Sequence, residues 1–184
     1  MAVPSQMFDH TLDAIKGWFH MAALDYTSKL SSNVTVDVYA GRCVHLNSDG
    51  EFELGALGSD MPIFLLQNGS DNDVSNDGGT RWYPIGPTGA ITGLVGAGSY
   101  ELETTEFDSA LTYAPNEYLR CKSSSNSSTD GGLLTNASTV AAEAGAGNPT
   151  NIVGVVSRGV RKRQSDRNNV LAFWTVYKPG KATY

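Results

Sequence analysis

The stretch Ile152-Val153-Gly154-Val155-Val156, followed by Val170-Leu171-Ala172-Phe173-Trp174-Thr175-Val176-Tyr177, decides the fold class of this chain. Both runs are apolar, rich in β-branched and aromatic residues and shorter than a typical helix, so they favour strands. The basic segment 161–169 that joins them is short enough for a hairpin connection. We therefore expect segments 152–160 and 168–177 to pair antiparallel in one sheet.

Alternation of apolar and polar side chains extends this pattern to most of the chain. Residues 34–39 and 100–105 alternate strictly, which predicts two half-buried strands. The pair Asp49-Gly50 separates two further apolar segments and predicts a hairpin with a primed turn. Other predicted strand segments are 43–46, 52–54, 61–66 and 91–95. The fold class that follows is all-β, a small β-barrel or β-sandwich with long loops.

The first 33 residues follow a different pattern from the rest of the 184-residue chain. Phe8, Leu12, Ile15 and Phe19 have helical spacing, although Gly17 weakens a helix there. We expect residues 1–33 to form an N-terminal arm or short helix, and residues 34–184 to form a single β domain. The apolar stripe either docks on a neighbouring molecule or covers the protein's own core.

A weak echo links the two halves of the β region. Tyr39-Ala40 leads to Arg42-Cys43, as Tyr113-Ala114 leads to Arg120-Cys121, and Asp-Gly pairs follow at 49–50 and 130–131. The apolar runs 61–66 and 152–156 continue the correspondence. Either an internal duplication with longer loops in the second copy produced these matches, or any chain of strands and turns would show them.

Charge is segregated along the sequence, whose net charge is −6. Residues 158–184 carry a net +6 and residues 1–157 a net −12, which predicts a charged partner surface or self-association. The acidic bulk argues against a dedicated nucleic-acid binder. No apolar stretch is long enough for a transmembrane helix, and no secretory signal is expected at the N-terminus. The basic residues that we expect to meet an acidic partner or sister subunit are Arg158, Arg161, Lys162, Arg163 and Arg167.

Residues with catalytic or metal-binding chemistry are sparse. Glu101 and Glu103 share one face of a predicted strand, where they are either a glycosidase pair or, as we favour, part of a solvated face. The three histidines have no metal-ligand spacing, and Cys43 and Cys121 are expected to be buried free thiols. Residues 73–78 match half of a calcium loop, but a polar turn is favoured. We expect no catalytic residue, metal or cofactor.

The strand and glycine pattern resembles the decoration, or cement, proteins of tailed-phage capsids. The resemblance covers most of residues 34–177. It rests on these segments: Ala40-Gly41-Arg42-Cys43-Val44-His45-Leu46, Asp49-Gly50-Glu51-Phe52-Glu53-Leu54-Gly55, Met61-Pro62-Ile63-Phe64, Gly98-Ser99-Tyr100-Glu101-Leu102-Glu103-Thr104-Thr105-Glu106-Phe107-Asp108, Asn116-Glu117-Tyr118-Leu119, Val153-Gly154-Val155-Val156-Ser157 and Val170-Leu171-Ala172-Phe173-Trp174.

The resemblance implies a non-enzymatic structural protein made in the bacterial host cytoplasm and located on the outer capsid surface of the virion. Its partners would be the major capsid protein and further copies of itself in a dimer or trimer, with no nucleic acid and no membrane. Two other functions stay open. The chain could be a carbohydrate-binding β module with Trp82, Tyr83 and Tyr100 as stacking platforms, or a small hydrolase built on the acidic strand.

Overall fold

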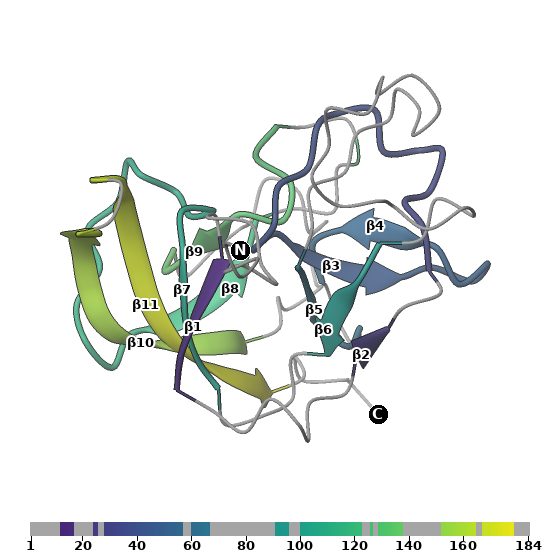
Figure 1. Cartoon of the computed structure of the whole chain (residues 1–184). Coiled ribbons are helices and arrows are strands. Elements are labelled where there is room, and N and C mark those ends of the chain that lie inside the picture. The colour runs from purple at the N-terminus through teal and green to yellow at the C-terminus, as the bar shows by residue number, and fades with distance from the viewer. Residues whose placement is uncertain are drawn as a thin grey trace, which may run out of the picture.

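The fold consists of strands joined by turns and loops. The computed structural model describes residues 12–16, 24–25, 28–56, 60–66, 91–95, 100–122, 126, 129–137, 152–164 and 167–178. This part of the chain contains eleven strands in two antiparallel sheets and no helix (Figure 1). The all-β prediction is confirmed.

The two sheets stand side by side in Figure 1. In sheet order, the six-stranded sheet contains β1 (Leu12–Lys16), β7 (Glu101–Thr104), β11 (Asn169–Lys178), β10 (Ile152–Lys162), β8 (Tyr118–Cys121) and β9 (Leu134–Thr135). The five-stranded sheet contains β2 (Leu24–Asp25), β6 (Gly93–Val95), β5 (Ile63–Leu65), β3 (Cys43–Leu46) and β4 (Phe52–Leu54).

The two sheets repeat one topology. Strands β2 to β6 lie in the order first, fifth, fourth, second, third, and strands β7 to β11 lie in the same order, with β1 added at the β7 edge. The segments of the sequence echo fall on matching strands: the two Arg-Cys segments lead into or lie on β3 and β8, and the two apolar runs hold β5 and the start of β10. Descent of both halves from one duplicated segment stays a prediction.

The longest hairpin is the one that the sequence predicted. Strands β10 and β11 pair antiparallel from Ile152 opposite Lys178 to Lys162 opposite Asn169, with irregularities that include one between Arg158 and Arg161. Because these strands are longer than their neighbours, their far end extends beyond β7 and β8. It lies on the outer side of the six-stranded sheet in Figure 1.

The β3–β4 hairpin is confirmed, but its turn differs from the predicted one. The backbone amide of Asn47 donates to the carbonyl of Glu51, and the side-chain oxygen of Asn47 accepts from the amides of Asp49 and Glu51. Gly50 has a φ of 75°, whereas Asp49 does not have a positive φ. A two-residue primed turn centred on Asp49 and Gly50 needs a positive φ at Asp49, so the longer loop with a single left-handed glycine forms instead.

Another local prediction was wrong, and one of the two alternatives for the N-terminal segment fails over part of its length. Residues 34–39 form no named strand, although Val34 and Val38 are fully buried, because the amide of Thr35 bonds to the carbonyl of loop residue Asn126 instead of a strand. The helical alternative for the N-terminal segment fails over residues 12–16, which pair with β7 as strand β1. An open sheet edge offers this segment backbone partners that its helical spacing does not reveal.

Apolar side chains gather in two clusters. The larger cluster draws residues from both sheets, and the rings of Phe64 on β5 and Phe173 on β11 lie 5.4 Å apart within it. The smaller cluster joins the five-stranded sheet to Val34 and Val38. Burying each such side chain stabilises the fold by roughly 1.5–3 kcal/mol, so among the described residues the larger cluster supplies apolar contact between the sheets.

Candidate functional site

Four charged side chains form a ladder across three strands of the six-stranded sheet. Arg158 on β10 donates from Nη2 and Nε to Oε1 of Glu101 on β7, at 3.0 and 3.3 Å. Arg161 on β10 donates to Oε2 of Glu103 on β7. Strand β11 lies between β10 and β7, and its small Ala172 stands opposite both Arg158 and Glu103. The long guanidinium side chains therefore reach across a whole strand.

The ladder corrects the prediction of a solvated acidic face. Only 3% of the Glu101 side chain and 6% of the Glu103 side chain are exposed, whereas the paired Arg158 and Arg161 are exposed to 45% and 39%. A buried carboxylate without a partner is costly, so the arginines stabilise the sheet by covering these two groups. The charge segregation predicted that the basic residues meet an acidic surface. For Arg158 and Arg161, this surface consists of Glu101 and Glu103 of the same chain.

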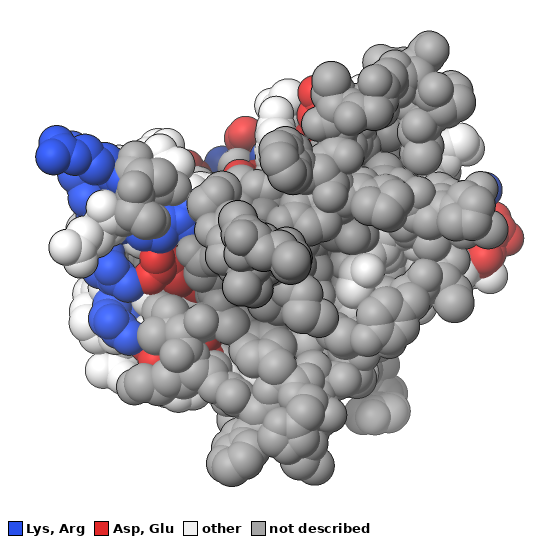
Figure 2. Space-filling model, viewed as in Figure 1, with Lys and Arg blue, Asp and Glu red and all other residues white. Residues whose placement is uncertain are grey.

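Two cations at the tip of the hairpin are exposed, whereas a third is buried. Arg163 is only 6% exposed and its backbone closes the turn with Asn168 and Arg167. Lys162 and Arg167 are exposed, and neither forms an ion pair with a described residue. Figure 2 shows the Lys and Arg side chains gathered along this side of the molecule, with carboxylates between them. Of the predicted basic set, Lys162 and Arg167 are therefore the exposed members without an ion pair to a described residue.

An apolar hollow lies beside this tip. Its volume is about 270 Å³, and it is lined by Phe107, Ser109, Leu111, Thr112, Tyr113, Gly159, Val160 and Asn169. Phe107 and Tyr113 are buried and meet edge to face, with ring centroids 5.6 Å apart, whereas Leu111 and Val160 are more than a third exposed. Gly159 permits this arrangement because a Cβ there would lie 2.7 Å from the carbonyl oxygen of Tyr113.

The hollow and the two exposed cations lie at the same end of the β10–β11 hairpin, and we call them together the hairpin-tip surface. It comprises Leu111, Val160, Lys162 and Arg167. Lys162 stands opposite Asn169 in the strand register, and Asn169 lines the hollow. The volume is below the roughly 300–1,000 Å³ of small-molecule sites. Apolar rim residues near exposed cations are suited to a protein segment that carries an apolar side chain and acidic groups.

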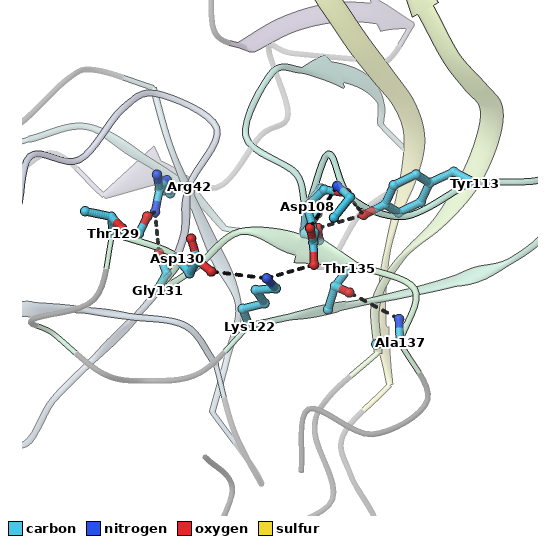
Figure 3. Close-up of polar contacts among 11 residues, drawn as sticks. Arg42, Asp108, Tyr113, Lys122, Thr129, Asp130, Gly131, Thr135 and Ala137 are labelled. Carbon is cyan, nitrogen blue, oxygen red and sulfur yellow. Dashed lines mark hydrogen bonds and ion pairs between the residues drawn. The ribbon is translucent and has the colours of Figure 1, made fainter. Parts of the chain in front are cut away.

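Sequence reasoning missed a second polar network, which ties the two sheets together (Figure 3). Arg42, just before β3, donates to Oε2 of Glu106, just after β7, at 2.5 Å. Its Nη1 donates to the carbonyls of Thr129 and Gly131 at 2.6 and 2.7 Å. Arg42 is 6% exposed. The only sequence signal was its place beside Cys43 in the echo, which gave no indication of a buried ion pair.

Lys122 extends this network along the end of β8. Its Nζ lies 2.7 Å from Oδ2 of Asp108 and 3.2 Å from Oδ2 of Asp130, and Figure 3 shows it between the two carboxylates. The hydrogen bond from Lys122 lowers the pKa of Asp108, and the reciprocal contact raises the pKa of Lys122. The contacts fix loop positions, so this network is structural.

Where the structure describes them, the remaining sequence candidates do not assemble into a site. His45 contacts the Gly55 carbonyl through Nδ1 at 2.9 Å, and no group of three or more His, Cys, Asp or Glu within the described ranges could hold a metal. Tyr100 is buried and cannot serve as a stacking platform. The calcium-like loop 73–78, His10, His20, Trp82 and Tyr83 lie outside the described residues.

The N-terminal stripe is placed only in part. Leu12 and Ile15 lie within β1 at the edge of the six-stranded sheet, and Phe8 and Phe19 lie outside the described residues. Contact of this stripe with a neighbour stays a prediction.

Neither Glu101 nor Glu103 lines the hollow, so the acidic strand and the concave surface are separate features.

Comparison with known proteins gives this chain no relatives: no family model, no curated protein and no solved structure matches it. Within the described residues, no helix is long and apolar enough to span a membrane.

Proposed function

We propose that this protein is a structural component of a virion that binds the outer surface of an assembled phage capsid and bridges neighbouring major capsid subunits. It acts without chemistry, and further copies of itself share the contact. The proposal combines the sequence resemblance to decoration proteins with one feature of the structure. That feature is the hairpin-tip surface, where Lys162 and Arg167 are exposed at the end of the hairpin that carries an apolar hollow rimmed by Leu111 and Val160.

The chemistry of this surface supports a protein partner. Exposed cations steer and orient an acidic partner, while the hollow supplies apolar contact that charge alone does not give. The occupant that fits is an acidic segment of the major capsid protein with one apolar side chain. Each single contact is weak, but repetition over a shell with many equivalent sites raises the effective concentration of every neighbouring contact.

The experiment uses expanded capsids that lack this protein. Purified protein should bind them in a saturable, symmetry-related number and raise their disruption temperature, because a ligand of the assembled state stabilises that state. The variant Leu111→Ser should weaken binding roughly tenfold, the effect of losing about 1.4 kcal/mol of contact. The double variant Phe8→Ser/Phe19→Ser tests the N-terminal arm in the same assay.

A matched control comes from the five-stranded sheet. Leu46 is 43% exposed on β3, close to the exposure of Leu111, so Leu46→Ser should leave capsid binding unchanged. Failure of the wild-type protein to bind expanded shells, or turnover of a glycoside in a substrate panel, would contradict the proposal. Saturable binding to glycans without binding to shells would favour the carbohydrate-binding alternative.

A further inference from the structure

The repeated topology places the two cysteines on corresponding strands. Strands β3 and β8 are the second strands of their respective five-strand sets, and each is paired with the strand that follows it. Cys43 begins β3 and Cys121 ends β8. The two residues therefore belong to different sheets, at the place where the halves of the molecule meet.

The backbone holds these strands close together. The amide of Cys43 donates to the carbonyl of Gly132 at 3.0 Å, and the amide of Gly132 donates to the carbonyl of Lys122, the neighbour of Cys121, at 3.2 Å. Gly132 can fill this narrow space because it has no side chain: a Cβ there would lie 2.4 Å from the carbonyl oxygen of Cys43. One glycine thus bridges the chain segments that carry both thiols.

The side chains also meet. Both cysteines are free thiols with no exposed surface, and both belong to the apolar cluster shared by the two sheets. The Cys121 thiol lies within hydrogen-bonding reach of the Cys43 thiol and of the backbone amide of Ala56. Burial raises the pKa of Cys121 well above its ordinary value, and the neighbouring thiol raises it further. The folded protein therefore holds a protected, slowly reacting pair.

We propose that Cys43 and Cys121 are a latent disulfide site that can link the two sheets covalently. With a small-molecule disulfide such as glutathione disulfide, one cysteine thiolate attacks a glutathione sulfur and releases one glutathione. The second cysteine then attacks the protein sulfur of the mixed disulfide, the mixed S–S bond breaks, and a second glutathione leaves. Two protein thiols are oxidised, and one glutathione disulfide is reduced to two thiols.

The link would stabilise the fold mainly by restricting the unfolded chain. The two residues are 78 positions apart, a long loop for which the entropic effect is large. If the protein is a virion component, the thiols stay reduced in the host cytoplasm and meet oxidising conditions after release. That consequence rests on the proposed function, but formation of the bond does not.

The test is a redox titration of the purified full-length chain alone, without capsids. The protein is equilibrated in glutathione buffers under native conditions, starting from both the reduced and the oxidised form, and again in denaturant. The effective concentration of the two thiols should be roughly a hundredfold to a thousandfold higher in the native protein. The oxidised protein should yield a single cross-linked peptide pair containing both residues, and its Tm should rise by roughly 5–15 °C.

Two comparisons keep the outcome clear. The same wild-type sample with excess reductant provides the unlinked reference, and Cys43→Ala and Cys121→Ala should show no Tm shift in oxidising buffer. An effective concentration no higher in the native state than in denaturant would overturn the proposal. So would glutathione adducts or cross-links between molecules as the main oxidised products. None of these outcomes depends on whether the protein binds a capsid.

Discussion

Gly132 and Gly50 share a left-handed backbone but differ in their surroundings. Their φ values are 77° and 75°, yet an added Cβ at Gly50 would meet nothing within 4 Å, whereas at Gly132 it would lie 2.4 Å from the Cys43 carbonyl oxygen. The turn signal Asp49-Gly50 shows from the sequence that position 50 needs a left-handed backbone. The sequence does not show that position 132 has no room for a Cβ, because close approach between distant segments leaves no local pattern.

This difference predicts two unequal losses of stability. Gly50→Ala should lower the free energy of unfolding by about 1–2 kcal/mol, the cost of a left-handed conformation for an L-residue. Gly132→Ala should lower it by at least about 2 kcal/mol more, because a Cβ contact with backbone forces the sheets apart. Chemical denaturation of both variants measures the difference. Equal losses of stability in the two variants would show that the backbone near Cys43 moves to accommodate the added Cβ without further cost.

The pKa of Asp108 gives a pH-dependent prediction. The hydrogen bond from Lys122 lowers this pKa below its ordinary value of 3.8 in the folded state. A lowered folded-state pKa adds stability that is present above the ordinary value and is lost as the pH falls through the folded value. In Lys122→Met, the Asp108 pKa should return toward 3.8, and less stability should be lost on acidification below about pH 4.

Carboxyl carbon shifts followed by NMR from pH 2 to 6 measure this pKa directly. Asp130→Asn is the matched control, because it removes the more distant of the two carboxylates around Lys122 and keeps the 2.7 Å contact with Asp108. The control should leave the Asp108 pKa below its ordinary value. A larger rise of the Asp108 pKa in Asp130→Asn than in Lys122→Met would show that the contact with Lys122 is not what lowers this pKa.

At the scale of elements, the positions of the strands could be predicted from the sequence. The side chains that pair across an intervening strand could not. The apolar runs at 152–156 and 170–177 carry enough β-branched and aromatic residues to specify the β10–β11 hairpin by themselves. Glu101 and Glu103 alternate with apolar residues, which indicates a polar outer face. The alternation cannot show that arginines from a strand two positions away cover that face, because strand order is a tertiary property.

The ladder predicts strong coupling between β7 and β10. Arg161→Leu should lower the free energy of unfolding by about 1–3 kcal/mol, because the carboxylate of Glu103 stays buried without its cation. The double variant Glu103→Leu/Arg161→Leu should recover most of this loss, since both charges are then absent. A double-mutant cycle by chemical denaturation measures the coupling.

Lys162 provides the control for that cycle. It neighbours Arg161 on β10 but is exposed and unpaired among the described residues, so Lys162→Leu should change stability by no more than about 0.5 kcal/mol. If Arg161→Leu is equally harmless, the ladder contributes no net stability.

At the scale of the whole molecule, the sequence predicted the fold class and hinted at the repeat. The spacing of Arg-Cys and Asp-Gly pairs placed corresponding strands in both halves, and the two sheets do share one strand order. The candidate site was predicted only in outline. Charge counting located the basic tip, but it could not separate the two arginines of the ladder and the buried Arg163 from the exposed Lys162 and Arg167.

The difference between the exposed Lys162 and Arg167 and the paired or buried arginines predicts how capsid binding depends on salt. Binding to capsids through the hairpin-tip surface should weaken as ionic strength rises, because the screening length falls from about 10 Å at 0.1 M to about 3 Å at 1 M salt. Lys162→Ser/Arg167→Asn should bind more weakly at low salt and lose most of this dependence. Asparagine suits position 167 because Arg167 has a φ of 62°, a conformation that asparagine adopts readily.

The apolar half of the surface should behave differently. Leu111→Ser removes contact area but no charge, so it should weaken binding at every ionic strength and leave the slope of affinity against salt unchanged. Lys29→Ser removes an exposed lysine that lies outside the strands and pairs with Glu51, just before β4, and it should change neither quantity. Affinities measured by capsid co-sedimentation at several salt concentrations separate these effects. A tip variant with the wild-type salt slope would exclude Lys162 and Arg167 from the capsid contact.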